Sequence, residues 1–344
     1  MKKNCTISST RSSNIELLRI ICMLLIIIGH IIMNHHDDNV TEYFISHILR
    51  PFTVVGVNVF VIISGYFGIN YKTDRLIRLF SQTWFYSVTA FFIVLFLGLH
   101  TLNLKKDILV FFPVFSNQYW FVTTYIALYC IAPIINKAIS SFDKENFSKG
   151  LLVGFILFYI WPTFAYLLNA NQLVKDAGYG IVNFVYLYLL GRYIRLYYND
   201  NRSCKYHLLI YISSSLSLFV SQYILSKILN FEFSSWISYN TFFVFISAVS
   251  LFLVFKNLIL HSSIINKIAS LCLAVYLFHM ARWETLANFL QIKEASEHNY
   301  ILMLIVYPVL IYACGFFIET IRLLLFDKFE KYICNLITSK LQQL

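Results

Sequence analysis

Residues Asn14 to Asn34 read NIELLRIICMLLIIIGHIIMN, an apolar run of the length that a membrane-spanning helix needs. Arg19 and His30 interrupt the run, and Glu16 lies near its start. At about 100° per residue, Arg19 and His30 fall within roughly 20° of each other on a helix and lie about 16 Å apart along its axis. The segment therefore presents one face with a cation near one end and an imidazole near the other.

This face of the helix is the first candidate site. Ionisable groups inside a bilayer are costly and usually face a polar cavity, so each is a functional hypothesis by default. The structural alternative is an Arg19 that reaches the membrane surface and a His30 that packs through a hydrogen bond. Ser13 to Glu16 also fit a capping box, so Glu16 has a helix-initiating role to weigh. Six residues share the face, which we call the α-helical stripe: Glu16, Arg19, Met23, Ile26, His30 and Asn34.

Composition places the whole chain in a membrane. Its 344 residues are 59% hydrophobic and only 13% charged, which is typical of a polytopic membrane protein and excludes a soluble domain. The net charge of +10 comes from basic residues dispersed along loop ends, so it indicates the positive-inside pattern rather than binding of nucleic acid. The first apolar run is too long for a signal peptide, and we expect an uncleaved first helix.

Hydropathy predicts an all-α fold of about ten transmembrane helices in a single domain, residues 1–344. Both termini are expected in the cytoplasm, as a segment at 1–13 and a tail at 327–344. Seven of the 27 Lys and Arg then lie at the outer side, namely Arg50, Lys105, Lys106, Lys175, Lys227, Arg282 and Lys293, and the cytoplasmic majority has the expected sign. The predicted spans are 15–35, 52–69, 79–99, 119–136, 150–168, 181–198, 208–229, 238–255, 268–285 and 301–326.

The second span and the loop after it carry further candidates. Asn58 is a polar group within the membrane, and Ser64-Gly65 allows close backbone approach, which often serves helix packing alone. Arg75 and Arg78 follow, three residues apart and so on one side of a helix. Positive-inside charge would explain both arginines, but guanidinium forks also bind phosphate groups bidentately.

Three residues at the later spans could contact a substrate. Trp120 opens the fourth span, where an aromatic anchor is the default and a platform for a sugar ring is the alternative. Tyr276 and His279 share one face of the ninth span, and His279 is a second buried histidine with a structural or a catalytic role. The adjacent His35, His36, Asp37 and Asp38 lack the spacing of a chelating pair, so we expect no metal site.

Several enzyme classes lack support. The seven cysteines are scattered singly and form neither a disulfide framework nor a zinc pattern. The chain has no phosphate-cradling Gly-rich loop, no nucleophile elbow and no HExxH motif. A nucleotide hydrolase is therefore not indicated.

Taken together, these motifs resemble the bacterial integral-membrane acyltransferases of acyltransferase family 3. The family signature, an Arg, ten residues and a His in the first helix, is matched by Arg19 and His30, and Glu16 stands at the acidic position before it. GVNVFVIISGYF, from Gly56, resembles the second-helix motif, with Asn58 where an Asp is common. The remaining motifs follow in order along the chain: Arg75-Leu76-Ile77-Arg78, Tyr119-Trp120-Phe121 and Ala274 to His279.

The resemblance implies transfer of an acyl group, usually acetyl from acetyl-CoA, to a hydroxyl of an extracytoplasmic glycan such as capsule, exopolysaccharide or lipopolysaccharide. It implies location in the bacterial cytoplasmic membrane, with a surface glycan or lipid-linked oligosaccharide as the acceptor, and leaves a homo-oligomer or a glycan-synthesis complex open. Arg19, Arg75 and Arg78 would hold coenzyme A, and His30, with Arg19 and Glu16, would be catalytic.

Two questions stay open at this level. His30 would act as general base or form an acyl-histidine intermediate. The group that stabilises the oxyanion, or contacts the substrate, is one of several candidates by type: Asn58, Ser64, Trp120, Tyr276 and His279.

A transporter or flippase for a lipid-linked sugar is the alternative function, with His30 and the arginines lining a transport path. Transporters often consist of related halves with broken helices, and the sequence shows no internal similarity. A glycan polymerase would be expected to have a large charged outer loop, and no such loop occurs in this sequence.

Overall fold

The protein is described by a computed structural model. It describes residues 11–34, 40–168, 170–229, 236–281, 285, 288 and 291–341, and within them the chain is helical with no β-strand. The predicted all-α fold is therefore confirmed. The loop from His35 to Asp38 lies outside the described residues.

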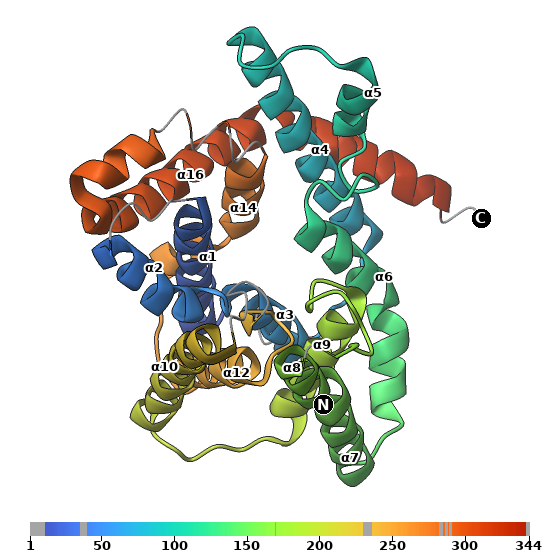
Figure 1. Cartoon of the computed structure of the whole chain (residues 1–344). Helices are drawn as coiled ribbons and strands as arrows, with labels where there is room; N and C mark the ends of the chain where they lie inside the picture. The colour runs from blue at the N-terminus through green and yellow to red at the C-terminus, as the bar shows by residue number, and fades with distance from the viewer. Residues whose placement is uncertain are drawn as a thin grey trace, which may run out of the picture.

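The helices follow one another with short connections (Figure 1). Their bounds are α1 Ser13–Asn34, α2 Val40–Thr53, α3 Gly56–Phe67, α4 Thr73–Phe96, α5 Leu104–Asp107, η1 Ile108–Phe111, α6 Trp120–Ser140, α7 Lys144–Phe155, η2 Ile156–Ile160, α8 Trp161–Leu167, α9 Ile181–Tyr197, α10 Cys204–Leu229, α12 Phe242–Lys256, α13 Ser263–Ala269, α14 Cys272–Met280 and α16 Ile292–Leu341. The segment η2 is a π-helical turn that joins α7 to α8.

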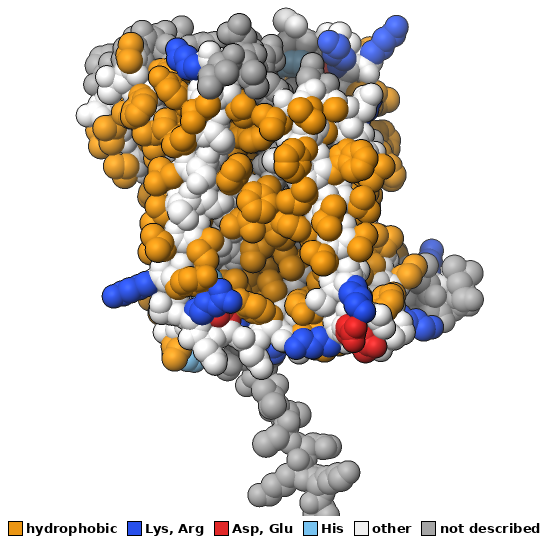
Figure 2. Space-filling model, turned by 60° about the horizontal axis from the view of Figure 1, so that its bottom comes forward, with side chains coloured by type: hydrophobic (Ala, Val, Ile, Leu, Met, Phe, Trp, Pro, Cys, Tyr) orange, Lys and Arg blue, Asp and Glu red, His pale blue; other side chains and the backbone are white. Residues whose placement is uncertain are grey.

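Eight helical segments of the described residues are long and apolar enough to cross a membrane. Helices α9 and α12 stand at two further predicted spans but are shorter, with 17 and 15 residues. The count of ten spans and the cytoplasmic placement of the termini therefore stay predictions. Figure 2 shows one face of the molecule, where apolar side chains form a broad belt with Lys and Arg along its lower edge. Such a belt is what a bilayer-embedded surface requires.

Helix α16 continues past the predicted end of the last span. Its residues are helical to Leu341, with a break at Asn299, where φ is −161° and ψ is 89°. The segment after Asp327 packs along the first turns of α4, where the Thr338 hydroxyl donates to Oδ1 of Asp74 at 2.6 Å and Ser81 donates to Glu330 at 2.7 Å. The expected tail is thus a helical extension that lies against α4.

Helix α1 lies between two groups of buried apolar side chains and packs against α2, α3, α12, α13, α14 and α16 (Figure 1). Ile15, Leu18 and Cys22 belong to the first group, which includes the buried faces of α3, α9 and α12. Met23 and Ile27 belong to the second, with residues of α14 and α16. The stripe on α1 therefore runs along the boundary between the two groups.

Helices α3 and α9 cross with their backbones in contact. A Cβ on Gly65 would lie 2.2 Å from the carbonyl oxygen of Tyr188, and one on Gly191 would lie 2.3 Å from the carbonyl oxygen of Ile62. Small residues permit this approach between membrane helices. Of the pair Ser64-Gly65, for which the sequence predicts close helix packing, Gly65 is the residue at the contact with α9.

Gly65→Ala and Gly191→Ala should each lower the stability of the folded protein by about 1–3 kcal/mol, because the added methyl group forces the helices apart. Gly150→Ala is the control, since a Cβ there meets no atom within 4 Å. The measurement is the midpoint of thermal unfolding in detergent. Equal midpoints for all three variants would contradict the crossing.

Candidate functional site

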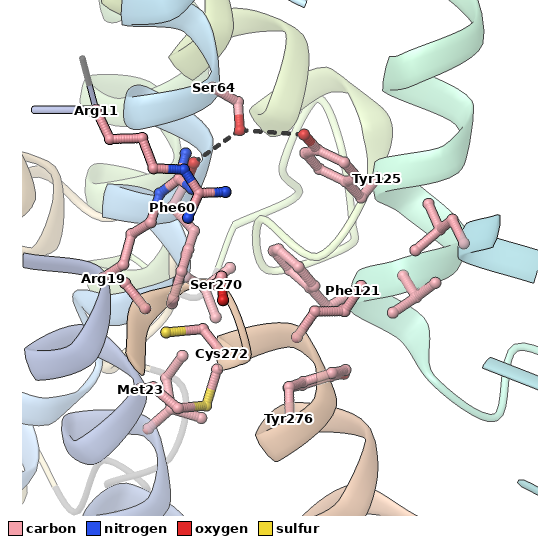
Figure 3. A pocket seen from close by; sticks show the side chains of 16 residues that line it. Arg11, Arg19, Met23, Phe60, Ser64, Phe121, Tyr125, Ser270, Cys272 and Tyr276 are labelled. Carbon is pink, nitrogen blue, oxygen red and sulfur yellow. Dashed lines mark hydrogen bonds between the residues drawn. The ribbon is translucent and has the colours of Figure 1, made fainter. Parts of the chain in front are cut away.

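The first cavity lies beside the N-terminal half of the stripe and has a volume of about 240 Å³ (Figure 3). We call it the Arg19 cavity. Arg11 and Arg19 lie at one end, and Tyr276 and Met23 lie toward the other. Its wall is formed by Arg11, Arg19, Met23, Ile26, Val57, Phe60, Ser64, Leu79, Phe121, Val122, Tyr125, Ala269, Ser270, Cys272, Leu273 and Tyr276. A basic entrance followed by an apolar interior suits a ligand with an anionic end and an apolar arm.

Glu16 and Arg19 form an ion pair one turn apart, with 3.6 Å between Oε1 and a terminal guanidinium nitrogen. The Glu16 side chain is 8% exposed and that of Arg19 is 32% exposed. Oε2 of Glu16 and Nε of Arg19 are both buried and form no hydrogen bond to any of the residues that the structure describes. Because buried polar atoms are nearly always satisfied, these two atoms indicate a place where a ligand supplies the missing bonds.

A second cavity of about 390 Å³ lies beside the C-terminal half of the stripe. We call it the His30 cavity. Arg50 of α2 enters its wall, together with two tyrosines of the loops that precede α9 and α12. Its wall is formed by Ile26, Gly29, His30, Met33, Arg50, Thr53, Val54, Tyr166, Ala177, Tyr179, Ile237, Ser238 and Tyr239.

His30 and His279 are hydrogen-bonded, with 3.0 Å between Nδ1 of His30 and Nε2 of His279. Nδ1 of His279 lies 2.9 Å from the carbonyl oxygen of Val275, which can only accept, so His279 carries its proton on Nδ1. His279 is fully buried, where a charged imidazolium is costly, so its Nε2 accepts from Nδ1–H of His30. The lone pair of a neutral His30 is then on Nε2, which is the arrangement that a general base needs.

Ile26 is the residue that lines both cavities among the part of the chain that the structure describes. Arg19 and Met23 precede it in the first cavity, and His30 follows it in the second. The two cavities therefore meet at one aliphatic side chain in the middle of α1. Four residues of the stripe thus line the cavity walls, namely Arg19, Met23, Ile26 and His30.

A buried chain of amides holds the loops over the His30 cavity. Asn58 is fully buried and donates from Nδ2 to the carbonyl oxygen of Tyr239 at 2.8 Å. Asn183 donates to Oδ1 of Asn58 at 3.4 Å and to the carbonyl oxygen of Gly178 at 2.8 Å, while the Tyr159 hydroxyl donates to Asn183. The Asn58 amide, an oxyanion candidate by residue type, is therefore committed to positioning these loops.

The other substrate candidates divide between the cavities. Ser64 lines the Arg19 cavity, and its hydroxyl donates to the Phe60 carbonyl oxygen at 3.0 Å and lies 3.3 Å from the Tyr125 hydroxyl (Figure 3). Tyr276 lines the same cavity, and its buried hydroxyl forms no hydrogen bond to any side chain that the structure describes. Trp120 lines neither cavity, and its ring packs against the rings of Tyr179 and Tyr239, which line the His30 cavity.

The structure separates the two arginines of α4. Arg75 is exposed and lies one turn before Leu79, which lines the Arg19 cavity. Arg78 forms an ion pair with Asp327 of α16 at 3.7 Å. Of the two, Arg75 is better placed to reach a ligand at the cavity entrance.

Sequence reasoning missed four residues of the cavity walls. The sequence pattern places Arg50 only among the outer charges, and it singles out neither Arg11 nor Tyr179 and Tyr239. An arginine two residues before the predicted span 52–69 was a signal that could have identified Arg50. The tyrosines lie in loops far apart in sequence, and no local pattern brings them together.

Comparison with known families matches residues 12–322 to a family model described as "Acyltransferase domain". Comparisons with curated proteins and with solved structures give no match.

Asn58→Ala should loosen the loops over the His30 cavity, because it removes the bond to the Tyr239 carbonyl group and the acceptor of Asn183. We expect faster tryptic cleavage after Lys175, an exposed residue of the loop that precedes α9. The cleavage rate should rise by about tenfold if roughly 1.4 kcal/mol of local stability is lost. Asn136→Ala is the control, because that amide binds the Ile69 carbonyl group and the Tyr188 hydroxyl instead. Equal cleavage of both variants would show that Asn58 does not hold the loop.

Proposed function

Because this chain belongs to the acyltransferase family, we propose that it transfers an acetyl group from acetyl-CoA to a hydroxyl of an extracytoplasmic polysaccharide such as capsule, exopolysaccharide or lipopolysaccharide. His30 acts as the general base. One observation supports this more than any other: the stripe on α1 lines a basic cavity at Arg19 and a second cavity at His30, and these meet at Ile26. Donor and acceptor can thus approach one point from opposite sides of the membrane.

The Arg19 cavity fits the donor substrate. Coenzyme A ends in phosphate groups, which guanidinium groups bind well, and Arg11, Arg19 and Arg75 stand at or near the entrance. The unsatisfied Nε of Arg19 offers a further donor. The apolar wall at Met23 and beyond suits the pantetheine arm.

The His30 cavity suits the acceptor. Tyr179 and Tyr239 offer aromatic faces and hydroxyl groups to a sugar ring, and Tyr166 adds a third hydroxyl to the wall. Nε2 of His30 carries the lone pair that receives the proton of the sugar hydroxyl. His279 is a positioning residue, since it fixes the tautomer and the orientation of His30.

The reaction is an acyl transfer. As His30 removes the proton, the sugar oxygen forms a bond to the thioester carbonyl carbon and the carbon–sulfur bond breaks. The coenzyme A thiolate leaves and takes the proton back from His30, so that no charge is left in the site. Tyr276, one turn before His279 on α14, is the proposed oxyanion donor, because it lines the donor cavity and its buried hydroxyl forms no hydrogen bond to a side chain of the described residues.

His30→Ala should reduce acetyl transfer by about 10²–10⁴-fold, because the proton acceptor is lost. The measurement is the O-acetyl content of the surface glycan by NMR, with the amount of protein in the membrane checked by immunoblot. His47→Ala is the control, because His47 lies on α2 and contacts the carbonyl oxygen of Tyr43 within its own helix. An unchanged acetyl signal in His30→Ala would remove the general-base role and shift attention to His279.

Arg75→Lys should weaken binding of acetyl-CoA by about tenfold, because lysine keeps the charge but loses the bidentate fork. Arg78→Lys should change binding less, since Asp327 already pairs with that position. Isothermal titration of the detergent-solubilised protein with coenzyme A measures both. Unchanged affinity in Arg75→Lys would reduce the arginine to a positive-inside charge.

A further inference from the structure

The His30 cavity contains a cation, Arg50, that is not paired with any carboxylate that the structure describes. Arg50 lies in the last turn of α2, is half-buried and lines the cavity. Within the part of the chain that the structure describes, no carboxylate forms an ion pair with its guanidinium group, and no Asp or Glu lines the cavity. Arg50 is therefore the one permanently charged side chain among the described residues of this wall.

The acidic residue of the loop beside this cavity is committed elsewhere. Oδ1 of Asp176 accepts a hydrogen bond from the backbone N–H of Gly178 at 2.8 Å and so closes its own turn. Tyr179 and Tyr239 are the groups whose charges would act on Arg50, but both are phenols and are neutral at ordinary pH. An arginine removed from water without an opposite charge is costly, so a ligand that carries an anion would stabilise it.

The rest of the wall is suited to a sugar. Tyr179 and Tyr239 of the wall have ring centroids 4.9 Å apart, and Trp120, which lies outside the wall, packs against Tyr179 at 4.4 Å. The amide chain through Asn58 and Asn183 fixes both tyrosine loops. A rigid aromatic surface beside a single arginine matches a sugar ring that bears a negative charge.

We propose that Arg50 binds an anionic group of the acceptor, so that the His30 cavity selects glycans that carry a carboxylate or a phosphate close to the acetylated hydroxyl. The guanidinium fork binds either oxyanion bidentately, and a neutral glycan leaves it unpaired. That the anion belongs to the acceptor glycan rests on the proposed function. That Arg50 forms an anion-binding site does not depend on the proposed function.

The test uses a cysteine reporter at Met33. This residue follows His30 by three positions, lines the same cavity and is 60% exposed. Met33→Cys is made in full-length protein in which the seven native cysteines are replaced, and its rate of labelling by N-ethylmaleimide is measured in detergent without acetyl-CoA. The probes are glucose, glucuronate and glucose 1-phosphate, so that the neutral sugar, the carboxylate and the phosphate are compared.

We expect at least one anionic probe to give half-protection at a concentration at least tenfold lower than glucose, and the stronger of the two identifies the preferred anion. Arg50→Gln should abolish this difference, and Arg50→Lys should retain part of it and show that the fold is preserved. Arg202→Gln is the control, because that exposed arginine lies between α9 and α10 and lines neither cavity.

Equal protection by all three probes, protection by none, or protection that survives Arg50→Gln would each overturn the inference. Transfer assays separate the two proposals. Acetylation that proceeds equally well on neutral and anionic glycans would reject the role of Arg50 and leave the acyltransferase intact. Arg50-dependent protection in a protein that transfers no acetyl group would reject the proposed donor or acceptor and leave the anion site.

Discussion

A membrane interior offers no water to polar groups, so the buried polar side chains of this protein must satisfy one another. Arg322 does so with Glu319 and Glu330, and the amides of Asn58 and Asn183 do so across three segments of the chain. This rule makes the exceptions informative. Two of these exceptions belong to side chains that line a cavity: the unsatisfied Nε of Arg19, and the guanidinium group of Arg50, which forms no ion pair with a described carboxylate.

Helix positions and the stripe on α1 were predictable from the sequence because both depend on local spacing. Apolar length sets where a helix crosses the bilayer, and 3.6 residues per turn set which side chains share a face. The contact between His30 and His279 was not predictable, since these residues are 249 positions apart and no local pattern joins them. The same limit applies to the two cavities, whose walls combine side chains from several helices and loops.

Residue type alone does not show which contacts a side chain makes. Asn58 donates to a loop carbonyl group, and Arg78 pairs with Asp327, and neither contact follows from the local sequence. An amide suits position 58, because its Nδ2 donates to the Tyr239 carbonyl oxygen, whereas an ionised aspartate would be repelled by that oxygen.

The meeting of the two cavities at Ile26 has a consequence for the cell. An enzyme that opens to both sides of an energised membrane would dissipate the ion gradients if its cavities were continuous. A dry aliphatic constriction resists the passage of ions and water, as in hydrophobic gates of channels. If the Arg19 cavity takes the proposed donor, Ile26 would act as such a seal, with Met23 and Phe121 in the wall of that cavity, until a flexible thioester arm displaced it. The same side chain would then keep the membrane electrically tight.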